Sequence, residues 1–254
     1  PDDAKRLRKK AAVLFEKFNA TFWDEAAGYY AYCLDGDKKP VWSVASNPGQ
    51  CLWSGIVPHD RALRVAERLQ KPDMWSGWGI RTLSADHKSF NPFKYQVGAV
   101  WPHDNGFIAQ GLKRYGLHEE TCAVAHSITQ AAGYFAMNQL PELYAGTQRD
   151  PSNFPVQYLG ANVPQGWAAG AVFSLLQAML GFQPDAPNQM LYVDPHLPAW
   201  MPDLTVRDLR LGSTRFDIEF VRHGHTTRFE VTKGPKKRVA RRSMKDWSKA
   251  LAGH

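Results

Sequence analysis

The sequence has few cysteines, and their spacing favours neither a disulfide framework nor a zinc site. Three cysteines occur among 254 residues, at Cys33, Cys51 and Cys122, and no two of them form a Cys-x-x-Cys pair. His223 and His225 are two residues apart on an expected strand, and we interpret them as exposed histidines rather than metal ligands. We therefore expect no metal and no cofactor. Unpaired thiols favour a reducing, cytoplasmic location.

The sequence also lacks long hydrophobic runs. No stretch approaches the roughly 18 apolar residues that a membrane-spanning helix needs. The first residues do not follow the basic, apolar and small-residue order of a signal peptide. A glycine-rich phosphate loop and the nucleophile elbow of a serine hydrolase are missing as well. These absences argue against a membrane protein, a P-loop enzyme and a serine hydrolase.

Excess positive charge is absent from most of the chain, although the formal net charge is +7. Residues 233 to 249 hold eight basic side chains against one acidic one, and the remaining residues carry 23 of each sign. We interpret this segment as a solvated, partly disordered tail, with a polyanion-binding arm as the alternative. It lacks the interleaved aromatic residues of a base-stacking platform, so we do not expect nucleic acid as a partner.

Apolar residues at helical spacing dominate the first three quarters of the chain. An amphipathic pattern covers the first expected helix, and because the chain opens on it without Met, we expect it to belong to something longer. Gly116 and Gly181 are the expected C-caps of two later helices. The expected helices span residues 3 to 18, 47 to 56, 58 to 70, 104 to 115, 118 to 138 and 165 to 180.

The pattern changes near residue 190, where apolar and polar residues begin to alternate as they do in strands. We expect a small antiparallel sheet there. The expected organisation is a helical part at residues 1 to 189, a small β appendage of the same domain at 190 to 232, and a basic tail at 233 to 254.

An irregular stretch rich in tryptophan and glycine, residues 73 to 102, has the mixture that a carbohydrate site requires. Aromatic rings can stack on the C–H faces of a pyranose while polar side chains bind its hydroxyls. Asp104 precedes an expected helix, so we favour an N-cap role over an acid/base dyad with His103. The candidates in and just after this stretch are Trp75, Trp78, Arg81, Tyr95, Gln96, Trp101, His103, Asp104 and Asn105.

Glu142 lies in the segment NQLPELYAG between Leu140 and Leu143, with no lysine or arginine nearby to neutralise it. A carboxylate in apolar surroundings costs free energy unless it is hydrogen-bonded or its pKa is tuned. One reading is a loop glutamate that points into water. The other is a functional carboxylate whose pKa is raised by burial toward the working pH.

Several blocks in order, rather than any one motif, resemble the C-terminal half of bacterial amylo-α-1,6-glucosidases and glycogen debranching-type proteins. The resemblance covers about residues 3 to 215. These proteins are six-hairpin glycosidases, so it implies a mainly α fold: an (α/α)6 toroid, here only its C-terminal half, with a small antiparallel sheet at the C-terminus. The blocks are SNPGQCLWSGI (46 to 56), WSGWGIRTLS (75 to 84), NPFKYQVGAVWPHDNGFIAQGLKRYG (91 to 116), LPELYAG (140 to 146), PVQYLGANVPQGWAAG (155 to 170) and LYVDPHLPAW (191 to 200).

The resemblance implies a role for Glu142 as the general base of an inverting glycosidase, in which two carboxyl groups stand roughly 6.5 to 9.5 Å apart. It also implies a subsite wall and its supports, all of them substrate-binding residues. These are Trp78, Arg81, Tyr95, Gln96, Trp101, His103, Asp104, Asn105 and Gln165.

Two departures from the family pattern qualify this function. Gln50 and Gln96 stand where family members carry histidine, and the Trp-x-Asp-Ser stretch that supplies the general acid is missing. We therefore expect a glycoside hydrolase part for α-glucosidic linkages that is inactive or very weak alone. The alternative is a non-catalytic carbohydrate-binding remnant. Expected partners are an oligo- or polysaccharide and, across an exposed apolar flank, the N-terminal half or a second copy.

Overall fold

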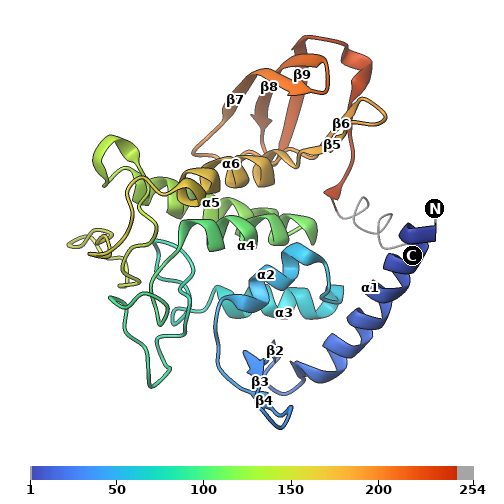
Figure 1. The fold of residues 1–254 in the computed structure, drawn as a ribbon. Helices are drawn as coiled ribbons and strands as arrows, with labels where there is room; N and C mark the ends of the chain where they lie inside the picture. Colours follow the sequence, from blue (N-terminus) through green and yellow to red (C-terminus); the bar gives the residue numbers. More distant parts are fainter. Residues whose placement is uncertain (1, 245–254) are drawn as a thin grey trace.

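The computed structural model describes residues 2 to 244, and a helix lies in each region where the sequence pattern predicts one. The helix expected at 118 to 138 ends six residues early, at Ala132. Figure 1 shows α4 in the middle, with α2 and α3 on one side and α5 and α6 on the other. The helices are α1 (Asp2–Thr21), α2 (Asn47–Ser54), α3 (His59–Leu69), α4 (Pro102–Arg114), α5 (His118–Ala132) and α6 (Gly166–Leu180).

Small residues let the helices around α4 approach closely. A Cβ added to Gly111 of α4 would lie 2.6 Å from Cβ of Leu52 in α2, and one added to Gly49 would lie 2.7 Å from Ile108. The apolar face of α3 is buried, as the periodicity predicts. Its buried residues are Ala62, Val65, Ala66 and Leu69. The helical core is therefore set by the spacing of small and apolar residues along each helix.

The expectation of a mainly α fold is wrong. Helices make up 37% of the structure and strands about 22%, in four small sheets. Two hairpins lie between α1 and α2: β1 (Trp23–Asp24) with β2 (Tyr29–Tyr30), and β3 (Cys33–Leu34) with β4 (Pro40–Val41). The other strands are β5 (Gln183–Asp185), β6 (Met190–Val193), β7 (Asp203–Leu211), β8 (Thr214–His223), β9 (Thr226–Lys233) and β10 (Val239–Arg241).

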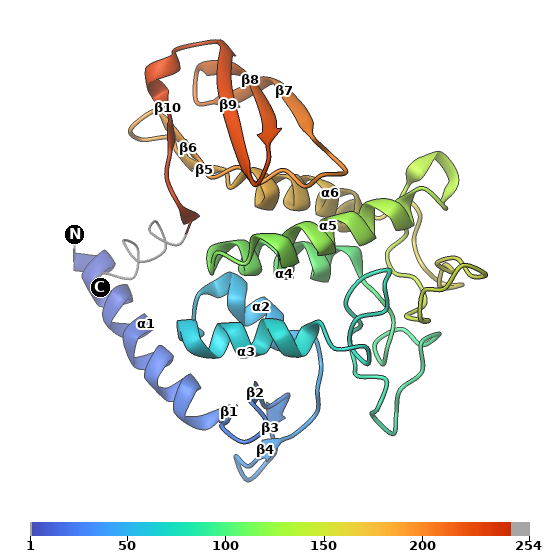
Figure 2. The same ribbon diagram turned by 180° about the vertical axis from the view of Figure 1, so that it is seen from behind.

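The sheet β7–β8–β9 forms its own core over α6, as Figure 2 shows from behind. All its pairings are antiparallel, as the alternating sequence predicts. Phe216, Ile218 and Phe220 alternate along β8 and are fully buried with Leu180 at the end of α6. This second core accounts for much of the strand content that a mainly helical reading underestimates.

Part of the segment expected to be a solvated tail is built into a sheet. Strand β10 pairs in parallel with β6, so the order of that sheet is β10–β6–β5. The Arg242 guanidinium lies 3.4 Å from the ring centroid of Tyr192, and its Nε donates to Oε1 of Gln183 at 3.1 Å. The short turn η2 (Lys236–Arg238) precedes β10. Residues 245 to 254 lie outside the described part of the chain.

Helix α1 contacts the rest of the protein mainly near its C-terminal end, and Figure 1 shows it extending away from the other helices. Phe18 stacks on Tyr30 with centroids 4.9 Å apart, and Asn19 Nδ2 donates to the carbonyl of Ile56 at 2.8 Å. The apolar residues Leu7 and Leu14 are more than half exposed. Within residues 2 to 244, no helix is both long enough and apolar enough to cross a membrane.

Candidate active site

Short backbone bridges bring the segment that carries Glu142 beside the irregular stretch after α3. Val100 pairs with Tyr144, and Tyr144 pairs in turn with Gln157, both in antiparallel sense. Glycine is needed at position 146, because a Cβ there would lie 1.8 Å from the carbonyl oxygen of Gly98. The Tyr-Ala-Gly sequence after Glu142 therefore allows two loops far apart in the chain to lie in contact.

Glu142 is buried, with 5% of its surface exposed, and its carboxylate accepts hydrogen bonds from neighbouring loops. The hydroxyl of Tyr95 donates to Oε1. The Asn162 side-chain amide and backbone N–H both donate to Oε2, at 3.2 and 3.3 Å. The backbone N–H of Glu142 also donates to the carbonyl of Asn162, at 3.1 Å. The reading of Glu142 as a loop glutamate pointing into water does not fit these contacts.

The expectation that burial raises the pKa of Glu142 is wrong. The hydrogen bond from Tyr95 lowers this pKa below its ordinary value of 4.5, and further hydrogen bonds from Asn162 and Gln165 add to the effect. Together they outweigh desolvation, because each donor stabilises the charged form. Glu142 is therefore ionised at neutral pH and can accept a proton.

Aromatic rings surround the carboxylate on one side. Tyr95 packs edge-on against Trp101 with ring centroids 4.7 Å apart, and Trp101 Nε1 donates to the carbonyl of Tyr95 at 2.9 Å. Trp101 is only 7% exposed and mainly supports Tyr95, whereas Trp167 is 50% exposed. The Trp167 ring stacks in parallel on His103 at 4.0 Å. The exposed indole of Trp167 gives the site an apolar face open to a ligand.

His103 and Asp104 point to different neighbours. Helix α4 begins at Pro102, a favoured first residue, with Trp101 as N-cap and no capping side chain, so the N-cap role expected for Asp104 is wrong. Oδ1 of Asp104 accepts from Nε2 of Gln50 at 2.6 Å, and Oδ2 is buried without a hydrogen-bond partner. Burial raises the pKa of Asp104.

The imidazole of His103 lies near enough to Glu142 for that carboxylate to affect its titration. Burial lowers the pKa of His103, and the charges of Asp104 and Glu142 only partly oppose this. Its Nδ1 is buried without a hydrogen-bond partner. Near neutral pH His103 is thus an uncharged ring that supports Trp167.

Three residues expected to bind substrate are buried and contact other parts of the protein. Trp78 is 1% exposed, lies beneath the Arg149 guanidinium at 4.2 Å and has no partner for Nε1. Arg81 is 3% exposed and donates to several backbone carbonyls, including that of Gly146 at 2.6 Å. Asn105 is fully buried and exchanges hydrogen bonds with the backbone of Ile80. These residues position the loops of the site.

The two expected glutamine contacts differ. Gln96 is exposed, and within residues 2 to 244 its side chain makes no hydrogen bond. Gln165 caps α6 by accepting from the N–H of Gly166 at 3.0 Å, and it also hydrogen-bonds to Glu142. Sequence reasoning did not single out Asn162 or Trp167. Asn162 lies just before α6 and Trp167 in its first turn, within a stretch rich in Gly, Pro and aromatic residues. This is the same signal that singled out residues 73 to 102.

Comparisons with known proteins agree on a glycoside hydrolase. The model of the family "Mannosylglycerate hydrolase MGH1-like glycoside hydrolase domain" matches residues 1 to 150. The mannosylglycerate hydrolase of Rubrobacter radiotolerans is 26% identical over 129 residues, which are 49% of this chain and 28% of that protein. The chain thus spans only about a quarter of the length of this curated relative.

Solved structures share the fold at low sequence identity. A sialidase covers 90% of this chain with a TM-score of 0.68 and 11% identity, and this chain covers 22% of that one. The GH78 rhamnosidase of Bacillus sp. GL1 covers 91% with a TM-score of 0.60 and 16% identity, again matching 22% of its own length. These neighbours have mixed α/β glycosidase-like folds, in agreement with the correction to the fold class.

The family match also corrects the resemblance drawn from motifs. It supports a glycoside hydrolase, but of the mannosylglycerate hydrolase type and not specifically of the glycogen debranching type. The family model covers more than half of the chain and includes Glu142. The chain belongs to the family of mannosylglycerate hydrolase MGH1-like glycoside hydrolase domains.

Proposed function

We propose that this chain is the part of a glycoside hydrolase that carries the general base, Glu142. The observation that supports this most directly is the state of its carboxylate. It is buried yet held in the charged form by Tyr95 and Asn162. The half-exposed ring of Trp167 packs against Trp101, which in turn contacts Tyr95, with the two indole centroids 6.1 Å apart. A purely structural carboxylate has no need of an open aromatic face next to it.

In the proposed reaction, Glu142 takes a proton from a water molecule as that water attacks the anomeric carbon. Tyr95 and Asn162 fix the carboxylate, and Trp167 stacks on the sugar ring. His103 holds Trp167 in place without adding charge. The base is charged across the neutral pH range, which is the state that its role requires.

Inversion also needs an acid to protonate the leaving oxygen. Among residues 2 to 244, the carboxyl group nearest in sequence to Trp101 and His103 is that of Asp104. Its Oδ1 accepts a hydrogen bond from Gln50. We propose that the acid comes from polypeptide outside this chain, which spans only 28% of its relative from Rubrobacter. The isolated chain is then inactive or very weak.

The family match favours a mannosylglycerate-type substrate, in which a mannosyl unit occupies the Trp167 face. The motif resemblance favours an α-1,6-linked glucosyl unit as the second candidate. An assay panel of mannosylglycerate and a branched limit dextrin separates the two.

The test uses the chain co-expressed with the remaining part of a mannosylglycerate hydrolase. Glu142→Gln should lower kcat by at least about 100-fold, the usual scale of a lost general base, with KM nearly unchanged. Glu120→Gln on α5 is the matched control and should retain full activity. If Glu142→Gln keeps its kcat, Glu142 is a structural residue. If the unchanged complex binds sugar without turnover, the non-catalytic remnant is the better description.

A further inference from the structure

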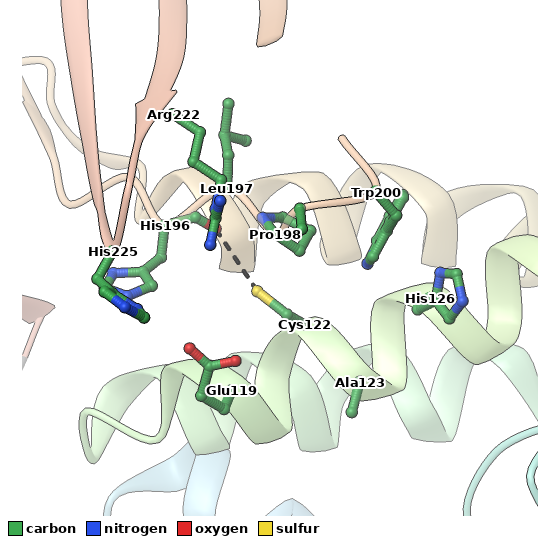
Figure 3. A pocket seen from close by; sticks show the side chains of 11 residues that line it. Glu119, Cys122, Ala123, His126, His196, Leu197, Pro198, Trp200, Arg222 and His225 are labelled. Atoms are coloured by element: carbon green, nitrogen blue, oxygen red, sulfur yellow. Dashed lines mark hydrogen bonds between the residues drawn. The ribbon is translucent and has the colours of Figure 1, made fainter. Parts of the chain in front are cut away.

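A second cavity, of about 320 Å³, lies between α5 and the sheet β7–β8–β9. Its lining shares no residue with the Glu142 site. In Figure 3, Glu119 projects from α5 on one side and Arg222 from β8 on the other, while Trp200 and His126 form one end. The lining residues are Glu119, Cys122, Ala123, His126, His196, Leu197, Pro198, Ala199, Trp200, Arg222 and His225.

The lining contains two formally charged side chains, and neither is paired with another group of the described residues. Within residues 2 to 244, the Glu119 carboxylate and the Arg222 guanidinium make no hydrogen bond and no ion pair. Glu119 offers two acceptor oxygens and Arg222 offers five N–H donors. The cavity therefore presents acceptors and donors on opposite sides of one space.

The imidazoles add polarity with little charge. Burial is the main cause that lowers the pKa of both His126 and His196, so these rings are neutral near pH 7. The negative charge of Glu119 offsets the positive charge of Arg222. An uncharged ligand with both donors and acceptors matches this lining better than a strong anion or cation. The described residues contain no group of three or more His, Cys, Asp or Glu that could hold a metal ion.

An aromatic surface completes the cavity. The Trp200 indole is 36% exposed and rests against His126 with ring centroids 4.8 Å apart and planes at 43°. The volume of the cavity lies at the lower end of the roughly 300 to 1,000 Å³ that small-molecule pockets occupy, which suits a single sugar ring. Polar groups around an exposed indole suit the two kinds of surface that a pyranose presents.

We propose that this cavity binds one neutral sugar unit, as a free saccharide or as the end of an oligosaccharide, at a site separate from Glu142. Trp200 stacks on the ring, Glu119 accepts hydrogen bonds from its hydroxyls, and Arg222 donates to its oxygens. Occupancy would hold a glycan against the junction of the helices and the sheet. The inference does not depend on Glu142 being catalytic.

The experiment follows the indole N–H signals of the nine tryptophans by ¹H–¹⁵N NMR on the whole chain. Trp200→Phe identifies the Trp200 signal. Titration with maltotriose or methyl α-D-mannopyranoside should move that signal saturably, and Glu119→Gln should weaken the binding about tenfold, the usual scale for one charge-assisted hydrogen bond. Glu142→Gln should leave binding at the Trp200 signal unchanged, which separates this site from the proposed function.

Matched controls keep the test specific. Glu120→Gln, next to Glu119 but outside the cavity lining, and Trp42→Phe, at an indole that is 51% exposed elsewhere, should leave the affinity unchanged. Circular dichroism should show that all variants retain the fold. The proposal is overturned if neither saccharide moves the Trp200 signal, if Glu119→Gln binds as tightly as the unchanged chain, or if sodium citrate alone moves it, since that marks an anion site.

Discussion

The hydroxyl of Tyr95 donates a hydrogen bond to Oε1 of Glu142, across 47 positions of the sequence. This contact is the largest cause of the lowered pKa of Glu142, and in return it raises the pKa of the Tyr95 hydroxyl. A donor that stabilises the carboxylate keeps it charged but also makes it a weaker base.

Tyr95→Phe should therefore raise the pKa of Glu142. With the donor removed, desolvation is opposed only by the contacts from Asn162 and Gln165. An NMR titration of ¹³C-labelled glutamate carboxyls, with Glu142→Gln to identify the signal, measures this. Tyr158→Phe is the control, because its ring packs on Tyr95 at 5.5 Å without a hydrogen bond to Glu142. An unchanged titration in Tyr95→Phe would contradict the proposed cause.

Arg81→Lys should destabilise the protein by about 3 kcal/mol. The buried guanidinium donates to the carbonyls of Gly146, Pro72 and Asp73 and to Oε1 of Gln148 at 2.6 to 3.1 Å. A lysine ammonium cannot reach this spread of acceptors and leaves buried carbonyls unpaired. Urea unfolding measures the loss.

The control for that substitution is Arg207→Lys on β7, where the side chain is exposed and makes no hydrogen bond among the described residues. It should change the free energy of unfolding by no more than about 0.5 kcal/mol. Equal effects of the two substitutions would mean that Arg81 does not hold the loops of the site together.

Stability should fall as the pH drops from 6.5 to about 4, partly because of His118. Burial, followed by the charge of Lys113 at 3.0 Å from Nδ1, lowers the pKa of His118 from 6.5 to about 4. The unfolded chain binds a proton below pH 6.5, whereas the folded chain resists until about pH 4, so protonation favours unfolding in this window. The contribution is roughly 2 to 3 kcal/mol.

His118→Asn keeps an acceptor for Lys113 but removes the titrating ring. The loss of unfolding free energy between pH 7 and pH 5, measured in urea, should be smaller in this variant than in the unchanged chain. His223→Asn, at an exposed histidine of β8, should have no such effect. A decline of the same size in His118→Asn would show that other groups control the acid sensitivity.

The isolated chain should associate through its exposed apolar residues. Phe173 and Trp167 on α6 are 74% and 50% exposed, and Trp53 on α2 is 47% exposed. Light scattering should detect dimers or larger species, and Phe173→Arg should reduce them. Met137→Arg, in the turn η1 (Ala136–Asn138) and 81% exposed, is the control. If the unsubstituted chain is a monodisperse monomer, the exposed residues Phe173, Trp167 and Trp53 do not form an interface.

Helix positions could be read from the sequence because they depend on local spacing. Apolar residues at helical intervals predicted α3 to within about one residue, and Gly181 ended α6 in a left-handed conformation as expected. The start of α4 was misplaced by two residues, because Pro102 begins the helix instead of Asp104. Pairing of residues 239 to 241 with β6 could not be foreseen, since it joins segments almost 50 residues apart.

The sequence by itself determined the helical periodicity and the alternating strands near the C-terminus, and it singled out one glutamate in an apolar segment as a candidate. Only the tertiary structure decided how that glutamate is tuned, because its donors Tyr95 and Asn162 come from loops that lie far from it in the chain. Burial alone would have raised its pKa, and hydrogen bonds made on folding reversed the direction. Glu119 on α5 and Arg222 on β8 likewise line one cavity only in the folded chain, because they lie about 100 positions apart in the sequence.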